Sequence, residues 1–127
     1  MITKQDSIKY DSKNNLIIVK SYGTASKERM VQDFNQVLKL SEIENCKNVL
    51  VDALKITKLP SITKLHSVGT AYSTMAVKLS EIQVAFAISD EISDDFKFFD
   101  NVLVNRGVHF QIFKNVGDAK AWLINKE

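Results

Sequence analysis

The feature that most constrains this chain is a repeated switch between two hydrophobic periods. Apolar runs within residues 16–19, 48–53 and 82–89 are typical of strands that are covered on both faces of a sheet. Between these runs, apolar residues recur every three or four positions, which is the spacing of one buried helix face. Strands that alternate with helices in this way predict an α/β fold with a mostly parallel sheet.

The expected order of elements is β-β-α-β-α-β-α-β-α, in a single domain that spans residues 1–127. The two segments around the turn DSKNN predict an N-terminal antiparallel hairpin, because Asp, Ser and Asn favour tight turns. A mostly parallel five-stranded sheet with packed helices follows from the later alternation. Strands are expected over 6–10, 15–23, 48–53, 82–89 and 108–113, and helices over 26–39, 60–79, 93–106 and 115–126.

Capping residues and apolar stripes support the helices at both ends of the chain. Ser26 is a plausible N-cap for the first helix, and Asn115 for the last. Pro60 is expected in the first turn of the second helix, where its missing N–H is tolerated. The residues expected to face the core are Met30, Phe34, Val37 and Leu38 in the first helix, and Val116, Ala119 and Leu123 in the last.

Charge and hydropathy narrow the range of partners and locations. The 17 basic and 15 acidic side chains give a net charge of +2, which provides no strong field for nucleic acid. No apolar run approaches the roughly 18 residues that span a bilayer, and the start MITKQDSIKY has no apolar signal region. Cys46 is alone, which excludes an intramolecular disulfide and fits a reducing compartment. We expect a cytoplasmic protein without stable membrane insertion.

The residue pattern favours binding over catalysis. His66 and His109 are the only histidines, and neither has a Cys or carboxylate at metal-ligand spacing, which predicts no metal site. No Ser, Cys or Thr stands in a nucleophile motif, and the four glycines do not match a phosphate-binding loop. We therefore expect no catalytic residues and no cofactor. An enzyme whose groups converge from distant loops is the alternative.

The end of the chain, IFKNVGDAKAWL, resembles the SpoIIAA-like branch of the STAS domains, which is structurally related to the Sec14-type lipid carriers. That branch typically ends its last strand on a phenylalanine, followed by an alanine and then a Trp-Leu pair. The matching residues here are Phe113, Ala119, Trp122 and Leu123. The segment NVLVDA, with Asp52, is similar to the central strand of the family. The resemblance covers about residues 15–126, and its motifs are packing motifs.

The resemblance implies two kinds of activity in a bacterial cytoplasm. Anti-sigma-factor antagonists of this branch bind a partner protein and are switched off by phosphorylation of a serine or threonine that follows the strand-end aspartate. Sec14-type relatives carry an apolar ligand between helices and sheet. After Asp52, the nearest hydroxyls are those of Thr57 and Ser61, five and nine positions on. These two residues are the candidate phosphoacceptors, although helix capping explains Ser61 equally well.

Polar residues after two of the apolar runs form a candidate binding site. Asp52 and Asp90 are expected at the carboxyl ends of parallel strands, where open α/β sheets place their sites. Lysines bunch around the loop expected after Asp52, and a helix N-terminus there favours anions. The candidate partner or anion site consists of Asp52, Lys55, Lys58, Ser61 and Asp90. The alternatives are a solvated lysine loop and an Asp52 that only accepts N–H bonds from the loop it begins.

Apolar residues off the expected core faces point to a contact patch. Phe98 and Val102 are rotated away from the stripe of the third helix, and Met75 lies off that of the second. Aromatic residues and Met are enriched in interface cores, but isolated exposed apolar residues are also normal. We expect a non-enzymatic binding domain that contacts a protein partner or associates with itself, or alternatively carries a small amphiphile or lipid in an apolar pocket.

Overall fold

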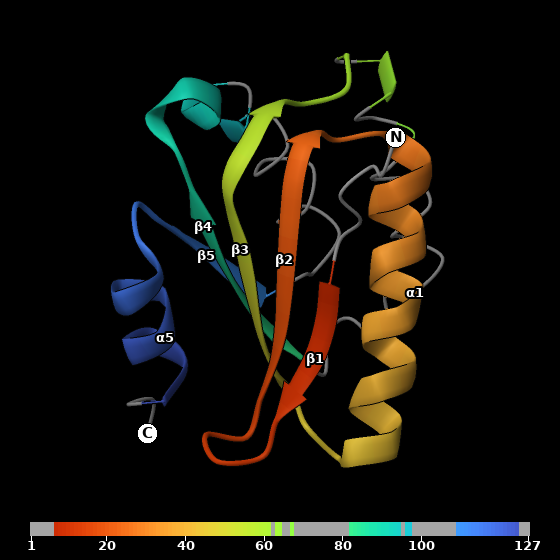
Figure 1. Cartoon of the computed structure of the whole chain (residues 1–127), viewed down its shortest axis with the longest axis vertical. Helices are drawn as coiled ribbons and strands as arrows, with labels where there is room; N and C mark the ends of the chain where they lie inside the picture. Colours follow the sequence, from red (N-terminus) through yellow and green to blue (C-terminus); the bar gives the residue numbers. More distant parts are fainter. Residues whose placement is uncertain are drawn as a thin grey trace.

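The structure is a computed structural model that describes residues 7–61, 63, 64, 67, 82–94, 96, 97 and 109–124 (Figure 1). Its strands form one five-stranded sheet in the order β1-β2-β3-β4-β5. The strands are β1 (Ser7–Asp11), β2 (Leu16–Thr24), β3 (Asn48–Lys58), β4 (Gln83–Ile88) and β5 (His109–Phe113). β1 runs antiparallel to β2, and the other three pairings are parallel. The predicted hairpin and mostly parallel sheet are confirmed.

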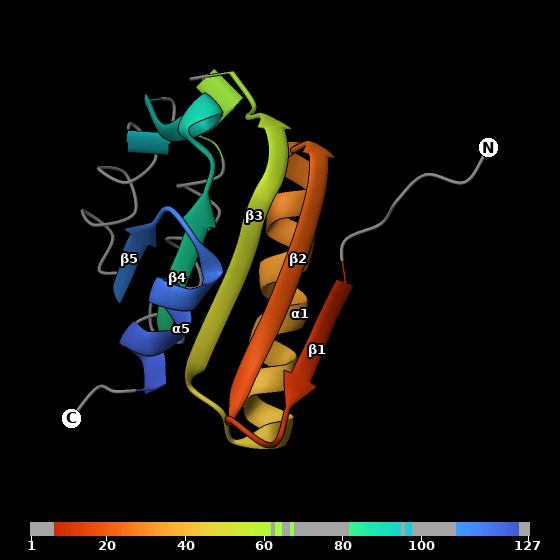
Figure 2. The same cartoon turned by 60° about the vertical axis from the view of Figure 1, so that its left-hand side comes forward.

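Two helices cover opposite faces of the sheet, as Figures 1 and 2 show. The helix α1 (Lys27–Glu44) packs on one face and α5 (Val116–Ile124) on the other. Each strand with an uninterrupted apolar run supplies both layers, because alternate side chains point to opposite faces. Ile17 of β2 packs in the α1 layer, for example, whereas Leu16 packs in the α5 layer. Both are fully buried, which confirms the prediction from the run.

The caps and stripes predicted for the two terminal helices are confirmed. The Ser26 hydroxyl accepts a hydrogen bond from Arg29 N at 3.1 Å, which satisfies a backbone donor of the first turn of α1. The Asn115 side-chain oxygen accepts one from Asp118 N at 2.8 Å at the start of α5. Phe34, Val37, Leu38, Ala119 and Leu123 are buried, while Met30 and Val116 are partly buried against the same layers.

The hairpin turn and the only cysteine have local structural roles. Asp11 accepts hydrogen bonds from Lys13 N at 3.1 Å and from the Asn14 amide at 2.9 Å, which closes the turn before β2. Cys46 is fully buried between α1 and β3. Its thiol donates to the carbonyl of Asn15 at 3.3 Å and so ties the α1–β3 connection to the hairpin.

The strand β3 is longer than predicted. The sequence places its end near Asp52, but β3 continues to Lys58 and pairs with β2 over this extension. The pairing shifts register twice, and each shift leaves one extra residue on β3. Gly23 of β2 has a φ of 70° beside the second shift, a backbone conformation that glycine adopts without strain. The expectation that Asp52 ends the strand is therefore wrong.

The second and third predicted helices lie mostly outside the described residues. Thr63, Lys64 and Ser67 are helical, as are Ser93, Asp94, Phe96 and Lys97. The Ser61 hydroxyl accepts from Lys64 N at 3.4 Å, which is the spacing of an N-cap. Pro60 therefore precedes the helix instead of lying in its first turn. A short 3₁₀ helix, η1 (Asp90–Ile92), follows β4 after a single residue, Ser89.

Candidate functional site

The carboxyl ends of the parallel strands bring three segments together at one edge of the sheet. Ala53 of β3 pairs with Ile88, the last residue of β4, so η1 begins beside the point where β3 leaves its β4 partner. At the far end of β3, the Lys58 carbonyl accepts a hydrogen bond from Ala25 N at 2.9 Å, just before α1. We call this edge the rim. It consists of residues 54–61, η1 and the start of α1 (Figure 1).

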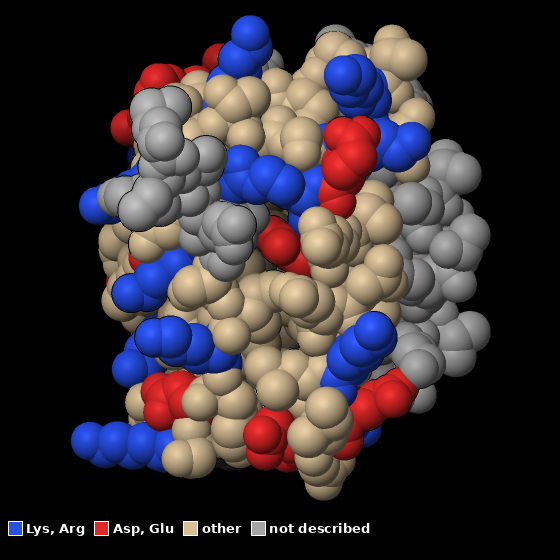
Figure 3. Space-filling model, turned by 45° about the vertical axis from the view of Figure 1, so that its right-hand side comes forward, with Lys and Arg blue, Asp and Glu red and all other residues tan. Residues whose placement is uncertain are grey.

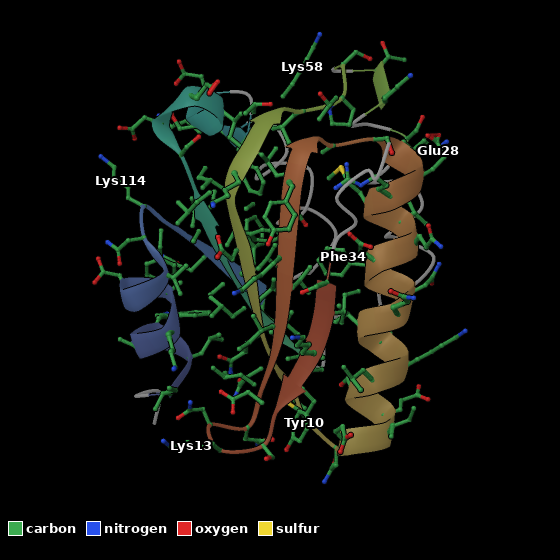
Figure 4. All side chains as sticks on the ribbon, in the orientation of Figure 1. Tyr10, Lys13, Glu28, Phe34, Lys58 and Lys114 are labelled. Carbon is green, nitrogen blue, oxygen red and sulfur yellow. The ribbon has the colours of Figure 1, made fainter. Side chains whose placement is uncertain are left out.

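The extension of β3 turns different side chains to the rim and to the interior. Lys55, Thr57 and Lys58 are exposed, whereas Ile56 and Leu59 are buried in the α1 layer. Figure 4 shows Lys58 pointing away from the body of the molecule at the top of the view. One short segment thus forms part of the core and also presents two positive charges to solvent.

Asp52 has a structural role at the first register shift. Its side-chain oxygen accepts a hydrogen bond from Leu54 N at 3.3 Å. The extra residue on β3 lies between Asp52 and Lys55, so the carboxylate satisfies a backbone donor where the ladder is irregular. The predicted acceptor role fits this contact, but the donor belongs to the strand itself and not to a following loop. The partly buried Asp52 lies next to Lys20 and Ala87 in register.

The acidic part of the rim comes from η1. Asp90 and Glu91 are exposed, and Ile92 is 2 % exposed and packs into the core. The Ser93 hydroxyl donates to the Asp90 carbonyl at 3.1 Å, which fixes the short turn. The structure therefore brings Asp90 to the same edge as Lys55 and Lys58. Carboxylates and ammonium groups share this edge, so its electrostatic field has regions of both signs. A partner surface with charges of both signs therefore suits it at least as well as a multivalent anion does.

The two candidate phosphoacceptors both lie on the rim. Thr57 is exposed in the β3 extension, and Ser61 is exposed at the cap position of the next helix. Lys58 and Lys64, both exposed, are their neighbours in the chain. Thr57 lies in β3 and not in the loop expected there, and phosphorylation of either hydroxyl stays a prediction.

An apolar pocket lies directly under the rim, between α1 and the sheet. Its volume is about 60 Å³. Aromatic side chains form one wall, with ring centroids 6.4 Å apart for Phe34 and Phe86 and 5.1 Å apart for Phe86 and Phe96. Figure 4 shows Phe34 directed from α1 toward the sheet. The other apolar residues of the described chain that line it are Val19, Ala25, Met30, Val37, Val51, Ala53, Ile56, Leu59 and Ile92.

Among the residues that the structure describes, three polar ones also line the pocket, and all three are partly exposed, so they mark its mouth. They are Ser21, Arg29 and Asp33. The Arg29 guanidinium donates to the carbonyls of Thr24 at 2.7 Å and Tyr22 at 3.1 Å, which anchors the end of β2 to α1. Asp33 is one helical turn further along α1, on the same face as Arg29. Figure 3 shows a hollow in this side of the molecule with acidic and basic side chains beside it.

The pocket was not predicted at this place. The amphiphile hypothesis expects an apolar cavity between the second and third helices and the sheet, a region that falls outside the described residues. Periodicity identified Phe34 and Val37 as core residues, but no sequence pattern indicates that a core is incompletely filled. The available signal was two separate small residues, Ala25 and Ala53, next to apolar stretches, because small side chains leave room that larger ones fill.

Several other predictions concern parts of the chain that the structure does not describe. Phe98, Val102 and Met75, the expected contact patch, lie outside the described residues. Among the residues that are described, no three His, Cys, Asp or Glu side chains gather in a way that would hold a metal ion. In the same part of the chain, no helix has the length and apolar character needed to cross a membrane.

Comparison with known proteins bears on the fold. A solved structure of an uncharacterized protein from the DUF3478 family, from Shewanella loihica PV-4, has a SpoIIAA-like fold. It superimposes with a TM-score of 0.58 at 17% sequence identity, over 97% of this chain and 98% of that one. No protein-family model and no curated protein matches the sequence. The chain therefore has a SpoIIAA-like fold, and the resemblance drawn from its terminal motif is confirmed at that level.

Proposed function

We propose that this chain is a non-enzymatic binding domain that contacts a protein partner through the rim. The observation that carries the proposal is the β3 extension, which leaves the β4 pairing at Ala53 and presents Lys55, Thr57 and Lys58 to solvent. The buried side chains of Ile56 and Leu59 anchor the backbone that carries these exposed residues. Preorganised surface residues lose less conformational entropy on binding, which favours recognition.

The charges of the rim indicate what kind of surface would fit it. Lysines of the β3 extension lie at the same edge as Asp90 and Glu91 of η1. A partner with complementary acidic and basic groups would gain from both, whereas a nucleic acid would be repelled by the carboxylates. The SpoIIAA-like fold supports a binding or regulatory role, and the buried free thiol of Cys46 fits a bacterial cytoplasm.

Phosphorylation and self-association are further proposals for the same domain. A phosphoryl group on Ser61 or Thr57 would add nearly two negative charges beside the rim lysines and so alter any charge-dependent contact. Self-association through Phe98, Val102 and Met75 rests on their sequence pattern alone.

A photo-crosslinking experiment tests the rim as a contact surface. A photoreactive phenylalanine replaces Thr57 on the rim or, as the matched control, Lys13 in the hairpin turn at the other end of the molecule (Figure 4). After irradiation in the native host, we expect the rim position to yield one discrete protein adduct that the control lacks. The adduct is identified by mass spectrometry, and its affinity is then measured with both proteins purified. Equal crosslinking from both positions would contradict the proposal.

A further inference from the structure

We propose that the outer edge of β1, together with the last turns of α1, is a surface on which a second copy of this chain docks by antiparallel strand pairing. β1 is the end strand of the sheet in the described part of the chain, where its strand partner is β2 (Figure 2). The outer N–H and C=O groups of an end strand can pair with another strand. The surface is separate from the rim, and the proposal does not require the protein partner.

The side chains of β1 divide between the two faces of the sheet. Ile8 and Tyr10 are partly buried and pack against the α1 layer. Lys9 points to the opposite face, where it is exposed, and the partly buried Asp11 shares that face at the end of the strand. A strand added to this edge therefore meets apolar groups on one face and two opposite charges on the other.

The spacing of these charges makes β1 complementary to itself. In an antiparallel pair, an acidic residue opposite Lys9 and a basic residue opposite Asp11 are stabilising. The added strand must therefore carry a basic residue two positions before an acidic one, which is the sequence KYD of β1 itself. A second copy supplies this pattern without any other protein.

Charge also decides how the two strands align. A two-fold axis perpendicular to the sheet places one residue of β1 opposite the same residue of the second copy. An axis at Lys9 sets two lysines opposite each other, which is destabilising, and an axis at Ile8 sets Lys9 opposite Ser7 without a charge pair. An axis at Tyr10 sets each Lys9 opposite Asp11 of the other copy. The charges therefore favour the alignment centred on Tyr10.

The carboxylate of Asp11 is already held in position for this contact. It accepts hydrogen bonds from Lys13 N at 3.1 Å and from the Asn14 amide at 2.9 Å. An ionised carboxylate has about four acceptor sites, so it can also accept from Lys9 of a second copy. Because the hairpin turn fixes the carboxylate before association, less conformational entropy is lost when the charge pair forms.

The last turns of α1 add apolar surface beside this edge. α1 packs along β1, and Figure 4 shows Tyr10 near the last turn of the helix. Leu40 is partly buried in the α1 layer, and Ile43, three residues later on the same side of the helix, is 76 % exposed. With the axis at Tyr10, the last turns of the two helices approach each other. Association then removes apolar surface of Ile43 from water, which is favourable.

Sedimentation equilibrium of the purified full chain measures the affinity of this pairing. We expect a dimer whose dissociation constant rises at least about tenfold in Lys9→Glu, because two attractive pairs become repulsive. Lys20→Glu is the matched control, since Lys20 is also an exposed strand lysine but lies on β2, and we expect a change within about twofold. A parent chain that is monomeric at millimolar concentration would overturn the proposal, as would equal effects of the two variants.

Lys9→Thr separates the two alignments by the sign of its effect. With the axis at Tyr10 it removes two attractive pairs, so we expect the dissociation constant to rise. With the axis at Lys9 it removes a repulsion, so the dissociation constant would fall, and that result would overturn the proposed alignment. Threonine favours strands, so β1 itself is preserved.

A disulfide reports the same alignment directly. Tyr10→Cys places two thiols opposite each other across the axis, at a separation that a disulfide can span. We expect mild oxidation to give a covalent dimer of Tyr10→Cys and none of the parent, because Cys46 is fully buried. A folded Tyr10→Cys chain that stays monomeric on oxidation would overturn the alignment. If circular dichroism shows that this variant does not fold, the Lys9 variants decide.

The outcome can be told apart from the other proposals for this chain. Phe98, Val102 and Met75 are predicted as a different contact patch, so Phe98→Ala should leave the Tyr10→Cys crosslink in place. Loss of that crosslink in Phe98→Ala would assign the dimer to the patch and overturn the edge proposal. These measurements contain no partner, so a failure of the rim proposal leaves them unaffected. In the photo-crosslinking experiment, a product of two copies has twice the mass of the chain, which distinguishes it from an adduct with the protein partner.

Discussion

Filling the pocket should stabilise the protein, because an incompletely packed core costs free energy. Ala53 is 7 % exposed, belongs to the α1 layer and lines the pocket. Cavities in protein cores cost about 24 cal/mol per Å³, so a volume of about 60 Å³ corresponds to about 1.4 kcal/mol. Ala53→Val adds two carbon atoms, and burial at about 0.8 kcal/mol per carbon gives about 1.6 kcal/mol. Both routes predict that the free energy of unfolding rises by about 1.5 kcal/mol.

Urea denaturation followed by circular dichroism measures this change. In a thermal melt of the same variant, we expect the melting temperature to rise by about 5 °C for a chain of this length. Ala87→Val is the matched control, since Ala87 is fully buried in the α5 layer and the added methyl groups must displace neighbours there. The control should lose about 1 to 3 kcal/mol through overpacking. If Ala53→Val destabilises the protein as much as the control does, the space under the rim is already filled in solution and the reasoning is refuted.

Four further perturbations test separate parts of the structure. Ser26→Ala removes the N-cap of α1 and should lower the free energy of unfolding by about 1 kcal/mol in urea, while Ser26→Asp keeps an acceptor and should lose less. Asp52→Ala leaves a backbone N–H of β3 without its acceptor and should cost about 1 to 3 kcal/mol, whereas Asp52→Asn should stay within about 0.5 kcal/mol. The hydrogen bond from the Asn14 amide holds the pKa of the Asp11 carboxyl below its usual range. The stability that this hydrogen bond gives to the folded state is therefore present at neutral pH and is lost as the pH falls below about 4. Asn14→Ala should therefore raise the Asp11 pKa in an NMR titration. Phe98→Ala should shift any oligomer toward monomer in analytical ultracentrifugation, in keeping with its predicted place in a contact patch.

Each of these predictions has an outcome that contradicts it. A Ser26→Ala variant as stable as the parent would remove the capping role, and equal losses for Asp52→Ala and Asp52→Asn would remove the acceptor role. An Asp11 pKa that Asn14→Ala leaves unchanged would assign the shift to another cause. An oligomeric state that is the same with and without Phe98 would withdraw this residue from the proposed interface.

The parts of the fold that were predictable follow from patterns that act over short distances. The apolar runs around Leu16 and Val49 identified strands that are covered on both faces, and the structure buries both residues completely. Ser26 and Asn115 were identifiable as caps, since a capping side chain bonds within the next three residues. The order of the strands was not predictable, because pairing joins segments that are far apart in the sequence.

The length of β3 was mispredicted because of a competing local signal. Pro60 and the polar residues before it predict a loop that leads into a helix, which places the end of the strand near Asp52. The stretch KITK, residues 55–58, contains the β-branched pair Ile56 and Thr57 with exposed and buried positions, which is typical of a strand. The two register shifts in the pairing with β2 interrupt the alternation of buried and exposed side chains along β3. The period of two that identifies a strand is therefore not visible in this stretch of the sequence.

The candidate site was only partly predictable. Topology predicts Asp52 and Asp90 at one edge of the sheet. Asp90 lies on the rim in η1, whereas Asp52 lies within β3, which continues to Lys58. The pocket under that edge depends on how side chains from α1, β3 and η1 fill the space between them. Three-dimensional packing of this kind leaves no periodic trace in a sequence.

The most direct measurement of the rim proposal is the affinity of the crosslinked partner for matched charge variants, with both proteins purified. Lys55→Glu combined with Lys58→Glu reverses the charge of the β3 extension, and Lys13→Glu makes a similar change in the hairpin turn at the opposite end. We expect the dissociation constant to rise at least about tenfold for the rim variant and to stay within about twofold for the hairpin variant. A partner that binds the rim variant as tightly as the parent, or loses more affinity with the hairpin variant, would contradict the proposed function.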